Sequence, residues 1–124
     1  PYLQLTEDFT AVELIRHLQS TKPFVKNLTA DELLEIAQLG HARHKFIRQY
    51  SSGMKQRLKL AQALFSNTSV LLLDEPTTNL DEAGIQLYKS LISKLTKDRL
   101  VVVCSNDKTE YDFCENIIMI DQYK

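Results

Sequence analysis

Residues Ser69 to Asp81 read Ser-Val-Leu-Leu-Leu-Asp-Glu-Pro-Thr-Thr-Asn-Leu-Asp, and the other predicted elements are arranged around them. The apolar run Val70 to Leu73 ends at two adjacent carboxylates, Asp74 and Glu75. An unbroken apolar run with this boundary predicts a short strand that is buried on both faces. Ligands of open parallel sheets bind outside the carboxyl ends of the strands, so both acids are candidates for a ligand site.

Two neighbouring residues of an extended chain point to opposite sides, so Asp74 and Glu75 need not share one task. One acid could hold a metal ion while the other handles a water molecule. The alternative is that the two acids only end the strand and start the turn at Pro76.

The 124 residues are 44% hydrophobic and 25% charged, which fits one globular domain of ordinary composition. The formal net charge of -1 carries no signature of binding to nucleic acid or to an anionic membrane. No apolar segment is long enough to cross a bilayer and no secretory signal is visible, so a soluble intracellular chain is expected. Cys104 and Cys114 are expected to be reduced packing residues. The start at Pro1 is typical of a piece of a longer protein.

Two capping boxes, in which a Thr is followed three residues later by a Glu, predict helices in the first part of the chain. One helix is expected over Thr10 to Leu18. The other begins at Ala30 and stops at Gly40, which suits a left-handed residue. The basic, weakly patterned sequence from Gly40 to Tyr50 predicts a loop with a short turn of helix.

The sequence Ser51-Ser52-Gly53-Met54-Lys55-Gln56-Arg57 precedes apolar residues at helical spacing, which predicts that a helix begins here. The serines offer cap hydroxyls, the glycine allows close approach, and the first N–H groups lie unpaired at the positive end of the helix dipole. These features make a site for a phosphate group. The alternative is that Ser51 or Ser52 simply caps the helix and Gly53 is incidental.

After Ser69 the sequence alternates strands and helices, which predicts an α/β fold with a parallel sheet and helices packed on it. Ser105-Asn106-Asp107 lies at the carboxyl end of the second strand. The expected elements are a helix capped by Asp81 and running to about Leu95, a strand over Leu100 to Cys104 with both faces buried, a short helix around Thr109 to Cys114, and a last strand over Ile117 to Ile120.

Three motifs together resemble the ATP-binding-cassette (ABC) ATPases. Residues 50–57 resemble the signature loop of that family, whose common form is Leu-Ser-Gly-Gly-Gln-x-Gln-Arg. Residues 71–77 look like the Walker B strand, and residues 79–81 look like the D-loop. Their order and spacing agree with the family, and the resemblance extends from about Asp8 to Asp121.

The resemblance implies a partial P-loop NTPase fold, in which a helical subdomain precedes a short parallel sheet with flanking helices. Residues 1–50 would be the helical subdomain, with Pro1 to Asp8 just past the Q-loop or at its tail. Residues 51–124 would be the second half of the nucleotide-binding core. The chain has no Gly-x-x-x-x-Gly-Lys-Ser/Thr loop to cradle phosphates, so a fragment of an ABC transporter ATP-binding protein, inactive by itself, is expected.

The resemblance also implies roles for single residues. Asp74 would hold magnesium, and Glu75 would be the general base that polarises the attacking water. The remaining candidates would bind ATP across a dimer: the γ-phosphate of a nucleotide on the opposite subunit would lie at the signature loop, and the D-loop acid would lie at the subunit interface. These candidates are Ser51, Ser52, Gly53, Met54 and Asp81.

Three residues depart from the family pattern. Ser52 stands where glycine is usual and adds a hydroxyl, while Met54 replaces the usual glutamine and removes a polar contact. Asn106 aligns with a histidine that contacts the γ-phosphate. Its amide can donate a neutral hydrogen bond but cannot carry a proton as imidazole does, so slow hydrolysis is expected.

The implied parent dimerises around two ATP molecules and drives a membrane-spanning transporter subunit, to which it binds from the cytoplasm. Binding to nucleic acid is not expected. Two alternatives remain: a degenerate or regulatory binding module, which Asn106 and Met54 favour, and a soluble ABC protein acting on ribosomes or nucleic acid, which the near-zero charge disfavours.

The absent first half predicts association. In the family's sheet, the strand that leads into the phosphate loop lies between the strands that correspond to residues 100–104 and 117–120. We therefore expect either direct pairing of these two strands or filling of the gap by another chain, which would give a dimer or a swapped assembly.

Overall fold

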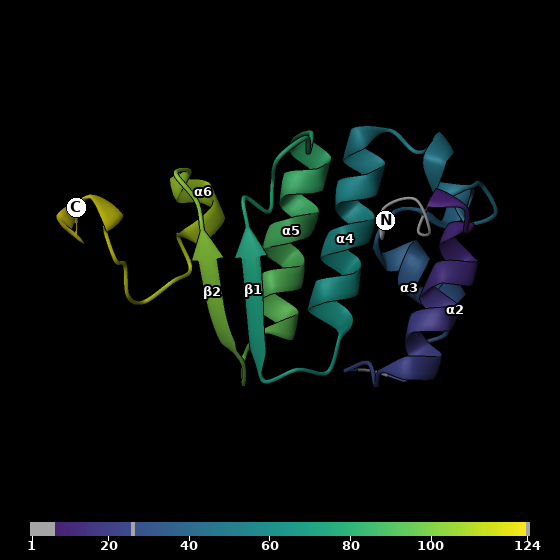
Figure 1. The fold of residues 1–124 in the computed structure, drawn as a ribbon, viewed down its shortest axis with the longest axis horizontal. Helices are drawn as coiled ribbons and strands as arrows, with labels where there is room; N and C mark the ends of the chain where they lie inside the picture. Colours follow the sequence, from purple (N-terminus) through teal and green to yellow (C-terminus); the bar gives the residue numbers. More distant parts are fainter. Residues whose placement is uncertain (1–6, 26, 124) are drawn as a thin grey trace.

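The computed structural model describes residues 7–25 and 27–123, and its elements are spread along the long axis of the molecule (Figure 1). The helical N-terminal part lies at one end, and the strands and the C-terminal segment lie at the other end. The assignment of residues 1–6 to the tail of a Q-loop lies outside the described residues. The α-helices are α2 (Ala11–Thr21), α3 (Ala30–Ile36), α4 (Ser52–Phe65), α5 (Glu82–Leu95) and α6 (Lys108–Tyr111); the 3-10 helices are η1 (Gly40–Ala42), η2 (Ile47–Gln49) and η3 (Ile120–Tyr123); the strands are β1 (Val70–Asp74) and β2 (Leu100–Cys104).

The predicted helix starts are confirmed by their caps. Thr10 accepts a hydrogen bond from the N–H of Glu13 at 3.3 Å, and Thr29 forms both halves of its capping box. Ser51 accepts from the N–H of Met54. Each cap oxygen satisfies an N–H group that has no partner within its helix.

The predicted stop of α3 at Gly40 is wrong. The helix ends at Ile36, and Gln38 is the left-handed residue, with φ of 61°. The N–H of Leu39 bonds the carbonyl of Leu34 at 2.8 Å, which is the hydrogen bond of a Schellman motif. Leu39 is fully buried, so its burial places the turn two residues earlier than the glycine pattern indicates.

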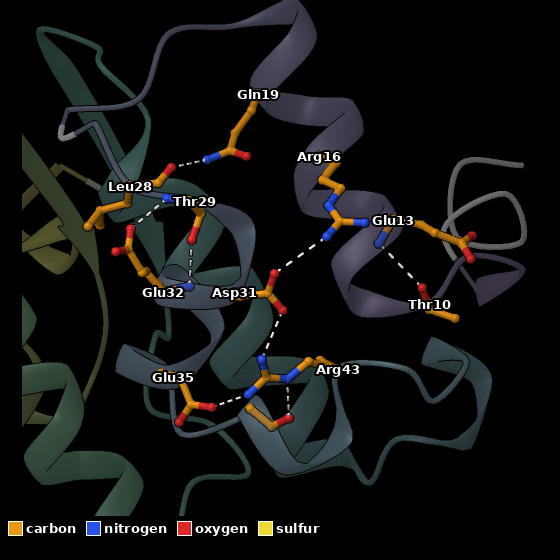
Figure 2. A network of polar contacts seen from close by, with 11 residues as sticks. Thr10, Glu13, Arg16, Gln19, Leu28, Thr29, Asp31, Glu32, Glu35 and Arg43 are labelled. Carbon is orange, nitrogen blue, oxygen red and sulfur yellow. Dashed lines mark hydrogen bonds and ion pairs between the residues drawn. The ribbon is translucent and has the colours of Figure 1, made fainter.

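Arg43 connects the turns of the helical part of the molecule (Figure 2). Its guanidinium donates to Asp31 at 2.9 Å, to Glu35 and to the carbonyl of Gly40. Asp31 also pairs with Arg16 of α2 at 3.4 Å. The half-buried Arg43 thereby holds α3 against η1, whereas the exposed Arg16 pair adds little.

The middle helix α4 packs against both α3 and α5, and one apolar core runs through α2, α3, α4, α5 and β1. The predicted cap and end of α5 are confirmed, since Asp81 accepts from the N–H of Gly84 at 2.8 Å and the helix ends at Leu95. Tyr88, near the middle of α5, is 1% exposed and anchors the helix in this core.

The strands β1 and β2 pair in parallel, as predicted, with Val70 opposite Leu100 and Asp74 opposite Cys104. The prediction that both strands are buried on both faces is wrong, however. Leu71 and Leu73 face the core, whereas Leu72 is 72% exposed. Side chains alternate across a strand, and the helices among the described residues cover one face of the sheet only. The side chains left on the open face are Val70, Leu72, Leu100 and Val102.

The predicted last strand over Ile117 to Ile120 is wrong. Residues 117–119 have no regular structure, Ile120 begins η3, and within the described residues the sheet consists of β1 and β2 alone. The segment leads away from β2 (Figure 1), and its four apolar side chains are exposed. The segment therefore does not pair directly with β2, because an apolar run forms a strand only beside a neighbour that supplies the ladder. The preceding helix, α6, is also shorter than predicted.

Candidate functional site

The two acids of the opening motif lie at the carboxyl end of β1 and are both exposed. The N–H of Glu75 donates to the carbonyl of Cys104 at 2.9 Å, so the chain leaves β1 beside the end of β2. Asn106 follows two residues after Cys104 and is also exposed. The structure therefore brings Asp74, Glu75 and Asn106 to the same edge of the sheet.

Glu75 has φ of 45°, a left-handed conformation that costs a side chain with Cβ roughly 1–2 kcal/mol. The turn that follows holds it there: its carbonyl accepts from the N–H of Thr78 at 3.1 Å. Asn79 is also left-handed, with φ of 66°. A strained residue at the end of a strand is typical of a functional site, where the surrounding structure fixes a side chain in position.

Both carboxylates are free to take a ligand, since neither has a hydrogen-bond or ion-pair partner among the described residues. The described part of the chain contains no cluster of three or more potential metal ligands. Magnesium at nucleotide sites is commonly held by one or two carboxylates, with water and phosphate oxygens completing the shell. An exposed, unpaired Asp74 fits that contribution.

A second group of predicted residues lines a hollow of about 230 Å³ between the start of α4 and the turn before α5. Gly53 lies close to this turn: a Cβ on it would approach the carbonyl oxygen of Asn79 to 3.0 Å. Gln56 donates to the carbonyl of Pro76 at 2.8 Å and holds α4 against the same turn. The residues lining the hollow are Ser51, Gly53, Met54, Arg57, Asn79, Leu80 and Asp81.

Four of the five residues predicted to bind nucleotide therefore come together in one hollow, and only Ser52 does not line it. Arg57, Asn79 and Leu80 were not among the predicted site residues. All three belong to the quoted motifs, so their sequence position was a usable signal. The hollow offers the cap hydroxyl of Ser51, the first N–H groups of α4 and a guanidinium, which together suit an anion.

Glu110 of α6 was missed altogether. Its side chain is buried, at 3% exposure, and accepts from the N–H of Thr77 at 2.9 Å, from the Thr77 hydroxyl and from the Ser105 hydroxyl. Tyr88 donates to its backbone carbonyl at 2.7 Å. Burial, and then the nearby Glu110 carboxylate, raises the pKa of Tyr88, so the phenol remains a donor. No local pattern distinguishes Glu110 from an exposed acid.

The sequence matches a family described as ABC transporter over residues 3–78, more than half of the chain. The chain belongs to the ABC transporter family. The match includes the signature-like residues 50–57 and the Walker B-like residues 71–77, whereas Asn106 lies beyond it. The family match thus covers α4, which Ser51 caps, and β1, which ends at Asp74.

The relatives of this ABC chain include transporter ATP-binding proteins from bacteria. It is 38% identical over 115 residues to "Uncharacterized ABC transporter ATP-binding protein YhcH" of Bacillus subtilis (strain 168), covering 88% of this chain and 38% of YhcH. It is 44% identical over 78 residues to "Bacitracin transport ATP-binding protein BcrA" of Bacillus licheniformis, covering 63% of this chain and 26% of BcrA. The chain therefore spans well under half the length of these relatives.

Solved structures of ABC proteins have the same fold. "Structure of ATP binding subunit of ABC transporter" gives a TM-score of 0.70 at 20% identity, covering 88% of this chain and 48% of that one. "Structure of a bacterial Atm1-family ABC exporter with ATP bound" gives 0.67 at 19% identity, covering 84% of this chain and 20% of the exporter. The predicted partial P-loop NTPase fold is thereby confirmed. None of the described helices is both long and apolar enough to span a membrane.

Proposed function

We propose that this chain is part of an ATP-binding subunit whose complete form hydrolyses ATP to drive transport across a membrane. The observation that carries the proposal is the exposed, unpaired acid pair at the end of β1, with Glu75 in a strained backbone conformation. Such an arrangement favours a role in the attack by water over a simple turn, because strained backbone conformations are concentrated at functional sites.

In this proposal Asp74 contributes to a magnesium site and Glu75 accepts a proton from the water that attacks the γ-phosphate. Magnesium supplies neutralisation of the charge that develops on the phosphate oxygens. Asn106 donates a hydrogen bond from its side-chain amide to the same phosphate. The position of all three at one edge of the sheet supports these roles.

The hollow at the start of α4 would receive the γ-phosphate of a nucleotide held by a second ATPase subunit. Ser51 accepts from the N–H of Met54 through an oxygen lone pair, so its hydroxyl hydrogen is available to a phosphate. Gly53 would add an N–H donor, and Ser52, which does not line the hollow but adjoins Ser51 in the chain, would add a hydroxyl donor. Asp81 would lie at the interface of the two subunits, while Met54 would contribute only apolar contact.

The proposed partners are a second copy or homologue of the ATPase subunit and a membrane-spanning subunit, with the ATPase on the cytoplasmic side. The named relatives are transporter ATP-binding proteins, which favours this proposal over a binding module and over a protein acting on ribosomes. The division at residue 50 into a helical subdomain and a core half stays a prediction.

The test uses the full-length protein that contains this chain, with Asp74→Asn as the variant. The proposal expects magnesium-dependent ATP hydrolysis, and it expects Asp74→Asn to raise the magnesium concentration needed for half-maximal turnover by about tenfold or more. Asp112→Asn, a substitution of an exposed acid in the turn after α6, is the matched control and should leave that concentration unchanged. A full-length protein without ATP turnover would refute the proposal.

For the 124-residue chain by itself we propose two properties. It should show no ATP turnover, because no loop of the Gly-x-x-x-x-Gly-Lys-Ser/Thr type is present to hold the phosphates. It should also self-associate, because the open face of the sheet and residues 117–120 expose apolar side chains.

A further inference from the structure

Glu110 holds together the two loops that carry the candidate catalytic residues. Its Oε1 accepts from both donors of Thr77, the N–H at 2.9 Å and the hydroxyl at 2.5 Å. Its Oε2 accepts from the hydroxyl of Ser105. Thr77 lies two residues after Glu75, and Ser105 immediately precedes Asn106. One buried carboxylate therefore bridges the turn after β1 and the loop after β2.

The backbone of Glu110 is hydrogen-bonded to α5. Tyr88 of α5 donates to the backbone carbonyl of Glu110 at 2.7 Å, and both side chains are almost fully buried. Within the described residues Glu110 has no cationic partner, so hydrogen bonds from neutral groups alone satisfy its carboxylate. Burying a carboxylate in this way is costly unless every acceptor site has a well-placed donor. The arrangement therefore tolerates little displacement of Thr77 or Ser105.

We propose that Glu110 is a positioning residue, which fixes the distance between Glu75 and Asn106 and so aligns the general base with the phosphate. This proposal rests on the proposed function. Glu75 is already held on one side by the bond from its N–H to the carbonyl of Cys104. The Glu110 bridge supplies the second hold, because it ties Thr77, two residues further along the turn, to Ser105 in the loop after β2.

The chemistry of the bridge provides a conservative variant. In Glu110→Gln, the amide oxygen accepts from Thr77, and the amide nitrogen can donate to the Ser105 oxygen, because a hydroxyl both donates and accepts. Glu110→Ala removes the bridge entirely. Ser105→Ala removes the bond from Glu110 to the loop after β2, together with the bonds between the Ser105 hydroxyl and the backbone of Asp107, and it leaves both bonds to Thr77 in place; it is the second variant. Tyr88→Phe is the structural control, since it removes the hydrogen bond to the backbone carbonyl of Glu110 but leaves the side-chain bonds of Glu110 to Thr77 and Ser105 in place.

The test measures ATP turnover by the full-length protein with its partner subunits, together with the thermal midpoint of each variant. Because a misplacement of about 1 Å can cost roughly 100-fold in rate, Glu110→Ala should lower kcat by about 10- to 100-fold with KM for ATP within about threefold. Glu110→Gln should restore most of kcat, and Ser105→Ala should fall between them. Tyr88→Phe should lower the thermal midpoint without a matching loss of kcat.

Amide hydrogen exchange gives a readout that does not depend on hydrolysis. Glu110→Ala should speed exchange at residues 76–79 and 105–107 relative to Glu110→Gln, and Tyr88→Phe should not. If the wild type has no turnover, the proposed function fails and exchange alone decides whether Glu110 fixes the loops. Unchanged exchange in Glu110→Ala, or a kcat that only follows the thermal midpoint across all four variants, would overturn the inference.

Discussion

Arg99 joins the ends of two helices through one guanidinium group. It donates to the carbonyls of Leu64 at 2.6 Å and Ser66 at 3.0 Å, at the end of α4, and to that of Leu95 at 3.3 Å, at the end of α5. It also bonds the carbonyl of Thr68 at 2.9 Å, just before β1. A cation is favourable at the carboxyl end of a helix, where the last carbonyls lack partners.

Replacement of Arg99 should therefore destabilise the fold. Arg99→Ala should lower the free energy of unfolding by about 2 kcal/mol, because several carbonyls lose a charged donor at once. Arg99→Lys should lower the free energy of unfolding by a smaller amount, since an ammonium group carries the charge but cannot match the planar fork of the guanidinium. Urea denaturation measures the difference. Lys97→Ala, an exposed change in the same turn, is the control, and equal free energies of unfolding for Lys97→Ala and Arg99→Ala would contradict this account.

Some of the important residues could be predicted from the sequence and others could not. Asp74, Glu75 and Ser51 could be found because each belongs to a local motif beside a strand end or a helix start. Arg99 and Glu110 could not, because their partners lie in other elements and only the folded chain brings them together. A buried carboxylate and a partly buried guanidinium have the same appearance in a sequence as exposed charges.

The helix starts were predicted correctly from the sequence, whereas the burial of the strands and the strand at 117–120 were not, for physical reasons. A cap depends on residues within one turn, so Thr29 and Asp81 could be identified from the sequence alone. The burial of Leu72 depends on what covers the sheet, and a strand at 117–120 depends on a neighbour. The stop of α3 depends on the burial of Leu39, which overrides the preference for Gly40.

The capping box of α3 allows the contribution of a helix cap to be tested. The Thr29 hydroxyl accepts from the N–H of Glu32 at 3.1 Å, and the N–H of Thr29 donates to the Glu32 carboxylate at 2.8 Å. Thr29→Ala should reduce the free energy of unfolding by about 1 kcal/mol, whereas Thr29→Ser should retain most of it. Chemical denaturation followed by circular dichroism would reveal the loss. Equal stability of the Ala and Ser variants would show that the cap contributes nothing.

The molecule as a whole has one uncovered apolar face. Leu72 and Val102 are partners in the register of the parallel strands, and they are 72% and 42% exposed. Residues 117–120 add further exposed apolar side chains, and the net charge of -1 provides little repulsion between copies. The chain covers only 38% of the length of YhcH.

Self-association of the 124-residue chain should depend on this face. The double variant Leu72→Lys with Val102→Glu introduces opposite charges at paired positions, which a parallel sheet tolerates while the face becomes polar. Sedimentation should then show a shift toward monomer relative to the wild type. The control places the same charges on exposed positions of α5, as Gln86→Glu with Ser93→Lys, and should leave association unchanged. A wild-type chain that is monomeric at all concentrations would contradict the prediction.

The most direct measurement compares ATP turnover by the full-length protein with that of its Glu75→Gln variant, at saturating magnesium and with nucleotide binding measured in parallel. If Glu75 takes the proton from the attacking water, turnover should fall by roughly 100-fold or more while ATP still binds. Turnover equal to the wild type in a variant that binds ATP normally would contradict the catalytic role assigned to the end of β1.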